Sequence, residues 1–203
     1  IGSGLVGSEM CIRDSSQTYV VVLGIYYKLQ TFLYLTANGV VQGMRPLISY
    51  NYGAGEIQRV RKIFRTSLTI IIGIMIVGVI LCLAVPEMLM KMFTSNPETI
   101  QIGVTAMRTI CIGFVVSAVS VTSAGAFEAL GKGIQSFMIS FLRYVAVILP
   151  AAFLLSRLFG AGSIWNAFWI AEFVTAAAAW ALYRKVMNPK DESEKEILTE
   201  KKE

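Results

Sequence analysis

The residues of greatest chemical interest are polar side chains that lie inside long apolar segments. Between residues 17 and 52, several of them fall on one helical face at 100° per residue: Lys28, Thr31, Asn38, Gln42, Arg45 and Ser49. Polar groups in an apolar helix usually face the bundle interior or a water-filled path. We therefore expect the part of this stripe from Lys28 to Arg45, in which Leu35 is an apolar gap, to line a hydrated substrate pathway. The alternative is that Lys28 and Arg45 reach the two membrane interfaces and the amides only join helices.

Three ionisable residues in other apolar segments are candidates for ion coupling or ion pairing: Glu128, Arg143 and Glu172. Glu128 lies four residues before Lys132, which predicts an i,i+4 pair, with a titrating carboxylate as the alternative. Glu172 has no basic residue at helical spacing, so we expect it to be neutral, paired across helices or bound to a cation. We expect Arg143 to pair with Glu128 or with an acid outside this sequence.

These residues lie in five apolar segments, each long enough to cross a hydrocarbon layer of about 30 Å as a helix. The predicted spans are 17–52, 66–93, 102–130, 135–158 and 164–186. Asn96 and Pro97 are typical of a capped helix start, and Pro150 predicts a kink. Small residues from Gly113 to Ala124 indicate a closely packed helix face. The sequence thus predicts an all-α, polytopic membrane helix bundle.

Composition supports a membrane protein and excludes several other classes. Hydrophobic residues make up 55% of the 203 residues and charged residues 15%, against about 25% charged in soluble domains. The net charge of +5 does not indicate nucleic acid, because the basic residues flank apolar runs, where membrane lipids are the expected partners. With scattered cysteines, no histidine and no phosphate-binding loop, we expect no catalytic site, metal site or cofactor.

Loop charge predicts the orientation in the membrane. Basic residues follow the first, third and fifth spans: Arg59, Arg61, Lys62, Arg65, Lys132, Arg184, Lys185 and Lys190. The opposite turns hold only Lys91 and Arg157. The positive-inside rule then places the C-terminus of this multi-pass membrane protein in the cytoplasm. Because five spans would leave the start outside, we expect a further helix upstream.

The two ends of the sequence differ from the predicted bundle of residues 16–187. Residues 1–15, IGSGLVGSEMCIRDS, lack a helical period and resemble translated sequencing-adapter read-through, so we interpret them as non-native. The alternative is a genuine interhelical loop. Residues 188–203 contain KDESEKEILTEKKE and predict a charged cytoplasmic tail.

Three segments carry a resemblance to one transporter family. The stretch GIYYKLQTFLYLTANGVVQGMRPLISYNYGAGEIQRVRK resembles the second helix and following loop of the C-terminal lobe of multidrug and toxic compound extrusion (MATE) exporters. FEALGKGIQSFMISFLR resembles the junction of the fourth and fifth helices of this lobe, where the family usually has Gln in place of Glu128. IWNAFWIAEF resembles the start of the last helix. The resemblance covers residues 24–185 and implies that these spans are the last five helices of a two-lobed transporter of the bacterial inner membrane.

The resemblance also implies an activity. It implies export of small amphiphilic or cationic drugs by antiport with H⁺ or Na⁺ through alternating access, with the missing N-terminal lobe of the same polypeptide as partner. One lobe alone is expected to be inactive. Some members place a cation-binding acid in the middle of the helix that here carries Ser117, Ser120 and Ser123. This sequence has no acid there, which argues against a Na⁺ site in this lobe. Coupling would then depend on a carboxylate of the missing lobe, which favours H⁺.

Two alternatives remain open from the sequence. A lipid-linked oligosaccharide flippase of the same superfamily would use a cationic cavity, which Lys28, Arg45 and Arg143 would suit. A cationic drug, in contrast, fits poorly beside Lys28 and Arg45 unless acids neutralise them. A non-transport membrane scaffold of five spans is the second alternative, against which the polar stripe argues because it would have no hydrated side.

Overall fold

The computed structural model describes the backbone of residues 3–187, and the side chains of residues 17–160 and 163–187. All regular elements in this part are helical: α1 (Ser3–Gly53), α2 (Ile57–Ala84), α3 (Pro86–Lys91), α4 (Pro97–Ile110), α5 (Ile112–Ala129), α6 (Gly133–Phe141), the π-helix η1 (Leu142–Ile148), α7 (Leu149–Phe159), the 3₁₀-helix η2 (Ala161–Ile164) and α8 (Trp165–Met187). The predicted all-α class is confirmed. The predicted tail at 188–203 lies outside the described residues.

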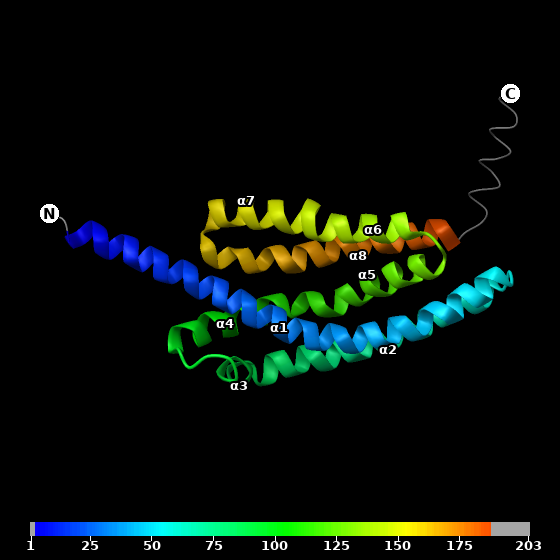
Figure 1. Cartoon of the computed structure of the whole chain (residues 1–203), viewed down its shortest axis with the longest axis horizontal. Helices are drawn as coiled ribbons and strands as arrows, with labels where there is room; N and C mark the ends of the chain where they lie inside the picture. Colours follow the sequence, from blue (N-terminus) through cyan, green and yellow to red (C-terminus); the bar gives the residue numbers. More distant parts are fainter. Residues whose placement is uncertain (1–2, 188–203) are drawn as a thin grey trace, which may run out of the picture.

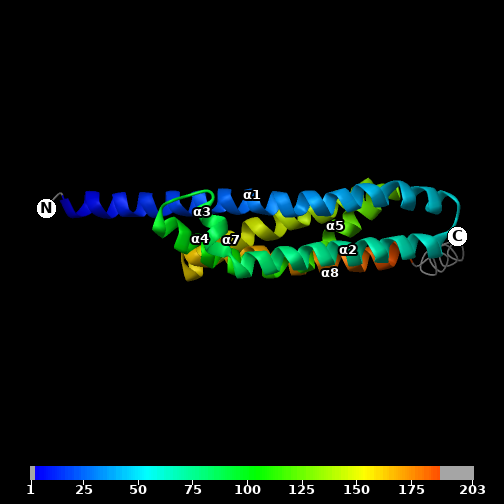
Figure 2. The ribbon, with the colours of Figure 1, turned by 90° about the horizontal axis from the view of Figure 1, so that it is seen from below.

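The long helices run back and forth along one axis (Figure 1). The α1–α2 turn, the α5–α6 turn and the end of α8 lie at one end of the bundle, and the α3–α4 and α7–α8 connections lie at the other (Figure 1). Seen from below, α1 runs along one side of the bundle and α2 and α8 along the opposite side (Figure 2). This up-and-down course matches the alternation of spans predicted from the sequence.

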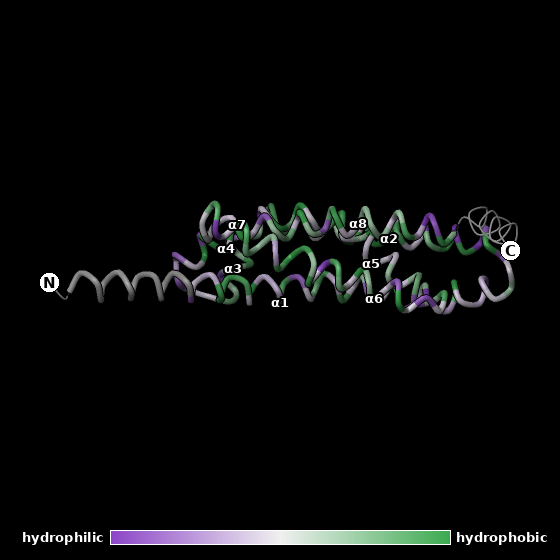
Figure 3. Tube along the Cα trace, turned by 90° about the horizontal axis from the view of Figure 1, so that it is seen from above, coloured by the Kyte–Doolittle hydropathy of each residue, from purple (hydrophilic) through white to green (hydrophobic). Residues whose placement is uncertain are grey.

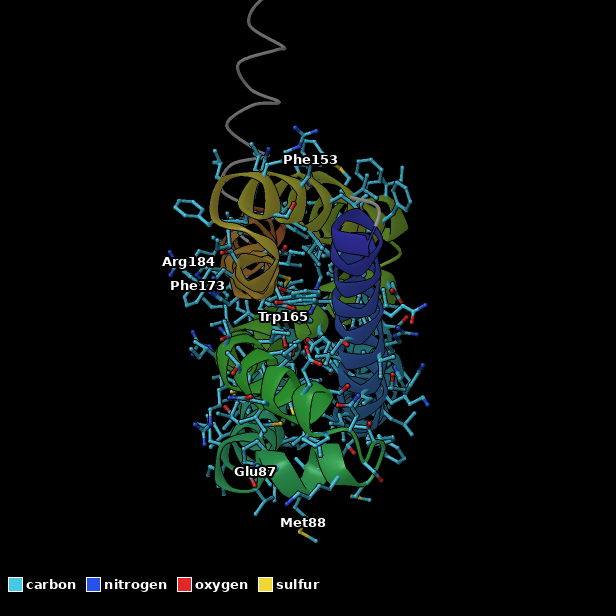
Figure 4. All side chains as sticks on the ribbon, turned by 90° about the vertical axis from the view of Figure 1, so that its left-hand side faces the viewer. Glu87, Met88, Phe153, Trp165, Phe173 and Arg184 are labelled. Atoms are coloured by element: carbon cyan, nitrogen blue, oxygen red, sulfur yellow. The ribbon has the colours of Figure 1, made fainter. Side chains whose placement is uncertain are left out.

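Four stretches are long and apolar enough to cross a membrane: Gln17–Gly53, Ile57–Ala84, Ile112–Ala129 and Gly133–Phe159. The fifth predicted span is α8, which runs back beside α6 and α7 (Figure 1). Hydrophobic residues follow α2, α5 and α8 over most of their length, with hydrophilic residues gathered towards their ends (Figure 3). Apolar side chains also cover the outside, as Phe153 at 61% and Phe173 at 49% exposed illustrate (Figure 4). A large apolar exterior of this kind suits contact with lipid.

The first three predicted spans have different boundaries in the structure. α1 extends to Ser3 on the N-terminal side of the predicted start, and whether residues 1–15 are native stays a prediction. α2 begins at Ile57, so the basic residues predicted in a turn at 53–65 occupy its first turns. That turn is short because Gly55 adopts a φ of +77°, which reverses the chain at little steric cost. The predicted third span is two helices, α4 and α5, which meet at Cys111.

Prolines mark the remaining irregularities. Asn96 caps α4 by accepting hydrogen bonds from the amides of Glu98 at 2.9 Å and Thr99 at 3.4 Å, with Pro97 in the first turn, as predicted. In the fourth span, the chain changes from α to π hydrogen bonding over Leu142–Ile148, just before Pro150. Proline has no amide hydrogen, so it removes one donor from the helical ladder at this place. A π-helical segment therefore lies on the N-terminal side of Pro150, where the sequence predicted a kink.

Candidate functional site

A polar cavity of about 200 Å³ lies between α1, α5 and the α6–η1 segment. Its polar lining consists of Tyr34, Asn38, Arg45, Ser120, Glu128, Ser140, Arg143 and Tyr144. Four of the residues singled out in the sequence, from three separate segments, therefore share one cavity: Asn38, Arg45, Glu128 and Arg143. The structure brings together side chains that the sequence could only place on separate helices.

Helical spacing and small residues build this cavity. On α1, the lining residues Tyr34, Asn38, Val41 and Arg45 recur every three or four positions and so share one face. On α5, Gly125 allows close approach, because a Cβ at this position would lie 2.3 Å from Val41 Cγ1. The helices thus touch where side chains are small and leave a gap at the polar positions beside them.

An ion pair between Arg45 and Glu128 crosses the cavity from α1 to α5. Arg45 Nη1 also donates to Gln42 Oε1 at 3.3 Å, and Glu128 Oε1 accepts from Ser136 Oγ at 2.9 Å. The predicted i,i+4 pair of Glu128 with Lys132 was wrong, because Glu128 pairs with Arg45 of α1. The two partners predicted for Arg143, Glu128 or an acid outside this sequence, were wrong as well, because Arg143 pairs with Glu172 of α8.

A second ion pair joins Arg143 on η1 to Glu172 on α8 and is nearly inaccessible to solvent, with 8% and 9% of the two side chains exposed. Cross-helix pairing was one of the outcomes predicted for Glu172. Arg143 Nη2 also donates to Tyr34 Oη at 2.9 Å. Tyr34 Oη donates in turn to Ser117 Oγ at 2.6 Å, and this hydroxyl donates to the Phe114 carbonyl at 2.7 Å. One hydrogen-bonded network therefore ties α1, α5, η1 and α8 together.

Gly113 provides the space for Glu172. A Cβ at Gly113 would lie 3.0 Å from Glu172 Cγ and 3.3 Å from the Trp169 Cα, so a larger residue would have to push these atoms aside, and glycine lets α5 and α8 approach closely. The buried Ser117, on the same face, takes part in the network described above. The predicted packing role of this small-residue face is confirmed here, and the contact it permits places a carboxylate deep in the bundle.

The rest of the predicted stripe does not line the cavity. The Lys28 ammonium lies 5.8 Å from the centroid of the Phe93 ring, which belongs to the α3–α4 connection. Thr31 Oγ1 donates to the Tyr27 carbonyl of its own helix at 2.7 Å, and Gln42 only supports Arg45. The stripe is thus divided, because a straight face of α1 meets different neighbours along its length.

Sequence reasoning overlooked Tyr34 and Tyr144. Tyr34 precedes Asn38 by four residues and so lies on the same face of α1, a spacing that could have indicated it. Both rings flank the buried arginine, with the Arg143 guanidinium carbon 5.6 Å from the Tyr34 centroid and 5.5 Å from the Tyr144 centroid. Cation–π contacts of this kind stabilise a guanidinium away from water.

Some buried polar atoms at the cavity have no hydrogen-bond partner among the described residues. Arg45 Nε and Ser120 Oγ are two of them, and both residues line the cavity. A buried polar atom costs free energy unless it is bonded. The cavity therefore suits water or a ligand that carries polar groups.

Solved structures of transporters resemble this chain closely. The Vibrio cholerae MATE transporter VcmN, solved as a point mutant, aligns with a TM-score of 0.78 and 21% identity over 83% of this chain and 38% of the other. A Pyrococcus furiosus transporter of the MOP superfamily gives a TM-score of 0.80 at 15% identity, over 84% of this chain and 39% of the other. The MATE multidrug transporter DinF-BH, solved as a complex, aligns with a TM-score of 0.74 and 30% identity over 86% of this chain and 40% of the other.

Sequence relatives agree with the structural ones. The multidrug export protein MepA of Staphylococcus aureus is 26% identical over 157 residues, which is 77% of this chain and 34% of MepA. The chain therefore spans about a third of the length of this relative. The MatE family model matches residues 3–154. A family match over most of the sequence, together with the membrane-length apolar helices, shows that the chain is a multi-pass membrane helix bundle and belongs to the MatE family.

Proposed function

We propose that the protein containing this chain exports small amphiphilic or cationic drugs, and that the polar cavity beside α1 is part of its substrate pathway. The observation that carries this proposal is the charge balance of the cavity. Each of its two arginines is paired with a glutamate, Arg45 with Glu128 and Arg143 with Glu172. The remaining wall of the pathway would come from the N-terminal lobe of the same polypeptide.

Charge balance also separates the proposal from the flippase alternative. A site for the pyrophosphate of a lipid-linked sugar needs unneutralised positive charge, whereas these two arginines face carboxylates. Lys28, the third cation that would have favoured a flippase, is not among the residues that line the cavity. The tyrosine rings of Tyr34 and Tyr144 give the cavity aromatic faces that suit an aromatic or cationic drug.

The proposed mechanism is antiport with inward H⁺ or Na⁺ through alternating access. Orientation follows from the positive-inside rule. The basic residues of α2, of the α5–α6 turn and of α8 all lie at one end of the bundle, including Arg61, Lys132 and Arg184 (Figure 1). We assign this end to the cytoplasm of a bacterial cell. Alternating access would require some cavity contacts to break, and the more exposed Arg45–Glu128 pair is suited to do so.

Ethidium efflux from bacteria that carry the complete gene and lack their own drug exporters tests this proposal. Glu128→Lys replaces the carboxylate that neutralises Arg45 by a second cation, so efflux of the cationic dye should fall severalfold. The matched control is Glu87→Lys, which makes the same charge reversal in an exposed i,i+4 pair with Lys91 on α3. Unchanged efflux in Glu128→Lys, or transport of a labelled lipid-linked sugar in vesicles without dye export, would overturn the proposal.

A further inference from the structure

A second polar hollow lies at the opposite side of the bundle from α1, between α2 and α8 near the end of α8. This basic cleft has a volume of about 340 Å³ and is lined by Arg61, Phe64, Arg65, Trp180, Tyr183 and Arg184, with Met187 at its edge. It shares no lining residue with the polar cavity. Its location is the bundle end that we assign to the cytoplasm.

Among the described residues, the positive charge of the cleft has no acidic counterpart. No acidic residue lines it, and within residues 17–160 and 163–187 none of its arginines takes part in an ion pair. Arg61 Nη2 instead donates to the Met187 carbonyl at 2.6 Å, which holds its guanidinium at the cleft between the two helices. Arg45, Arg59 and Arg143, in contrast, each have a glutamate partner.

Aromatic rings form the wall beside these arginines. The Phe64 and Tyr183 rings stack across the two helices with centroids 3.8 Å apart, and the Arg184 guanidinium lies 5.1 Å from the Trp180 centroid. Tyr183 is only 7% exposed, and its hydroxyl has no hydrogen-bond partner among the described residues. Arg184 itself lies at the edge of the bundle (Figure 4). The cleft thus combines a buried hydroxyl and guanidinium groups, none of which has a carboxylate partner among the described residues, with an apolar wall.

We propose that this cleft binds the phosphate of an anionic membrane phospholipid. Guanidinium groups match phosphate oxygens in geometry and charge, and basic pockets between spanning helices at the cytoplasmic side bind anionic lipid headgroups. The aromatic wall suits the glycerol region of a lipid, where Trp and Tyr are enriched in membrane proteins. Apolar residues further along the same face of α2, such as Ile76 at 43% exposed, eleven residues after Arg65, would contact the acyl chains. This inference rests on the proposed orientation and is independent of the exported substrate.

Lipid retention by the intact transporter provides the test. The protein, delipidated in detergent, is incubated with phosphatidylglycerol or phosphatidylethanolamine, and bound lipid is counted by native mass spectrometry. Wild type should retain phosphatidylglycerol in preference. Arg61→Gln/Arg184→Gln should lower its affinity at least about tenfold, because each charge-assisted hydrogen bond contributes about that factor or more.

Matched variants separate this site from a general effect of charge. Lys62→Gln/Lys185→Gln removes the same net charge from neighbouring positions that do not line the cleft, so it should retain the lipid as wild type does. Arg61→Lys/Arg184→Lys keeps the charge and should retain part of the preference, which guards against loss of folding in the glutamine variant. Equal retention by the two glutamine double variants, or no preference over phosphatidylethanolamine, would overturn the proposal.

Two further arms identify the source of the anion. Inorganic phosphate at millimolar concentration should displace little phosphatidylglycerol, and efficient displacement would indicate a site for free phosphate instead. The sequence after Met187 carries its own acids, including Asp191 and Glu192. A protein shortened to Met187 should retain the lipid as the full chain does. Retention only after this shortening would assign the cleft to the chain's own acidic segment and would contradict lipid binding.

Discussion

Two arginine–glutamate pairs adjoin the same cavity and differ chiefly in their exposure. The side chains of Arg45 and Glu128 are 35% and 41% exposed, whereas those of Arg143 and Glu172 are 8% and 9% exposed. Water screens the first pair, so breaking it costs little free energy. Removing one partner of the second pair would leave a charge buried without compensation, which is far more costly. An arginine–glutamate pair can therefore break during a conformational change where it is exposed, and can hold helices together where it is buried.

The surroundings of the two pairs strengthen this contrast. The buried pair continues through Tyr34 and Ser117 to a main-chain carbonyl and links elements that are far apart in sequence. Within the described part of the chain, the further partners of the exposed pair are Gln42, one turn away, and Ser136, across the α5–α6 turn. We expect the buried pair to hold the lobe together while the exposed pair changes partners during transport.

The largest effect should come from removing one member of the buried pair. Glu172→Leu leaves the Arg143 guanidinium unpaired inside the bundle and should lower the free energy of unfolding by about 3–5 kcal/mol. Thermal unfolding of the intact transporter in detergent measures the change. Arg143→Met/Glu172→Leu should recover most of the lost stability, because it removes both charges. A double variant no more stable than the single one would show that the pair does not act as a unit.

Much of this architecture could be predicted from residue patterns, but the pairing of charges could not. Apolar runs placed the spans, and Asn96 with Pro97 and Pro150 marked real irregularities, because these signals are local. The partners of Glu128 and Glu172 depend on which helices become neighbours, and that is set by packing at Gly113 and Gly125. The stripe from Lys28 to Arg45 shows the same limit, since helical periodicity fixes a face but not what the face contacts.

The next effect concerns the packing that seats the buried pair. Gly113→Val would place carbon atoms against Glu172 and the Trp169 backbone, and overpacking of this kind typically costs about 1–3 kcal/mol. Gly73→Ala on α2 is the control, because a Cβ there meets nothing within 4 Å. Thermal unfolding should separate the two variants. Equal unfolding temperatures for both would mean that the close approach of α5 and α8 does not position Glu172.

Changes to the exposed pair should affect drug efflux more than they affect stability. Exchanging its members, Arg45→Glu/Glu128→Arg, should change the free energy of unfolding by about 1 kcal/mol or less. Arg45→Glu alone brings two carboxylates together and should slow ethidium efflux more than the exchanged pair does. The comparison uses efflux rates at matched protein levels. A double variant as slow as the single one would assign importance to the individual positions instead of to the charge pair.

The smallest effect is expected at Lys28, which lies on the same face of α1 as Arg45 in the sequence but contacts Phe93 in the structure. Lys28→Ala should leave ethidium efflux unchanged, because this ammonium does not line the polar cavity. Asn38→Ala is the matched variant, since Asn38 lies on the same face and does line the cavity, so its efflux should fall. If the two variants slow efflux equally, the pathway follows the whole polar face of α1. The substrate would then contact every polar residue on this face of α1, including those outside the cavity. The two ion pairs of the cavity would no longer account for where the substrate passes.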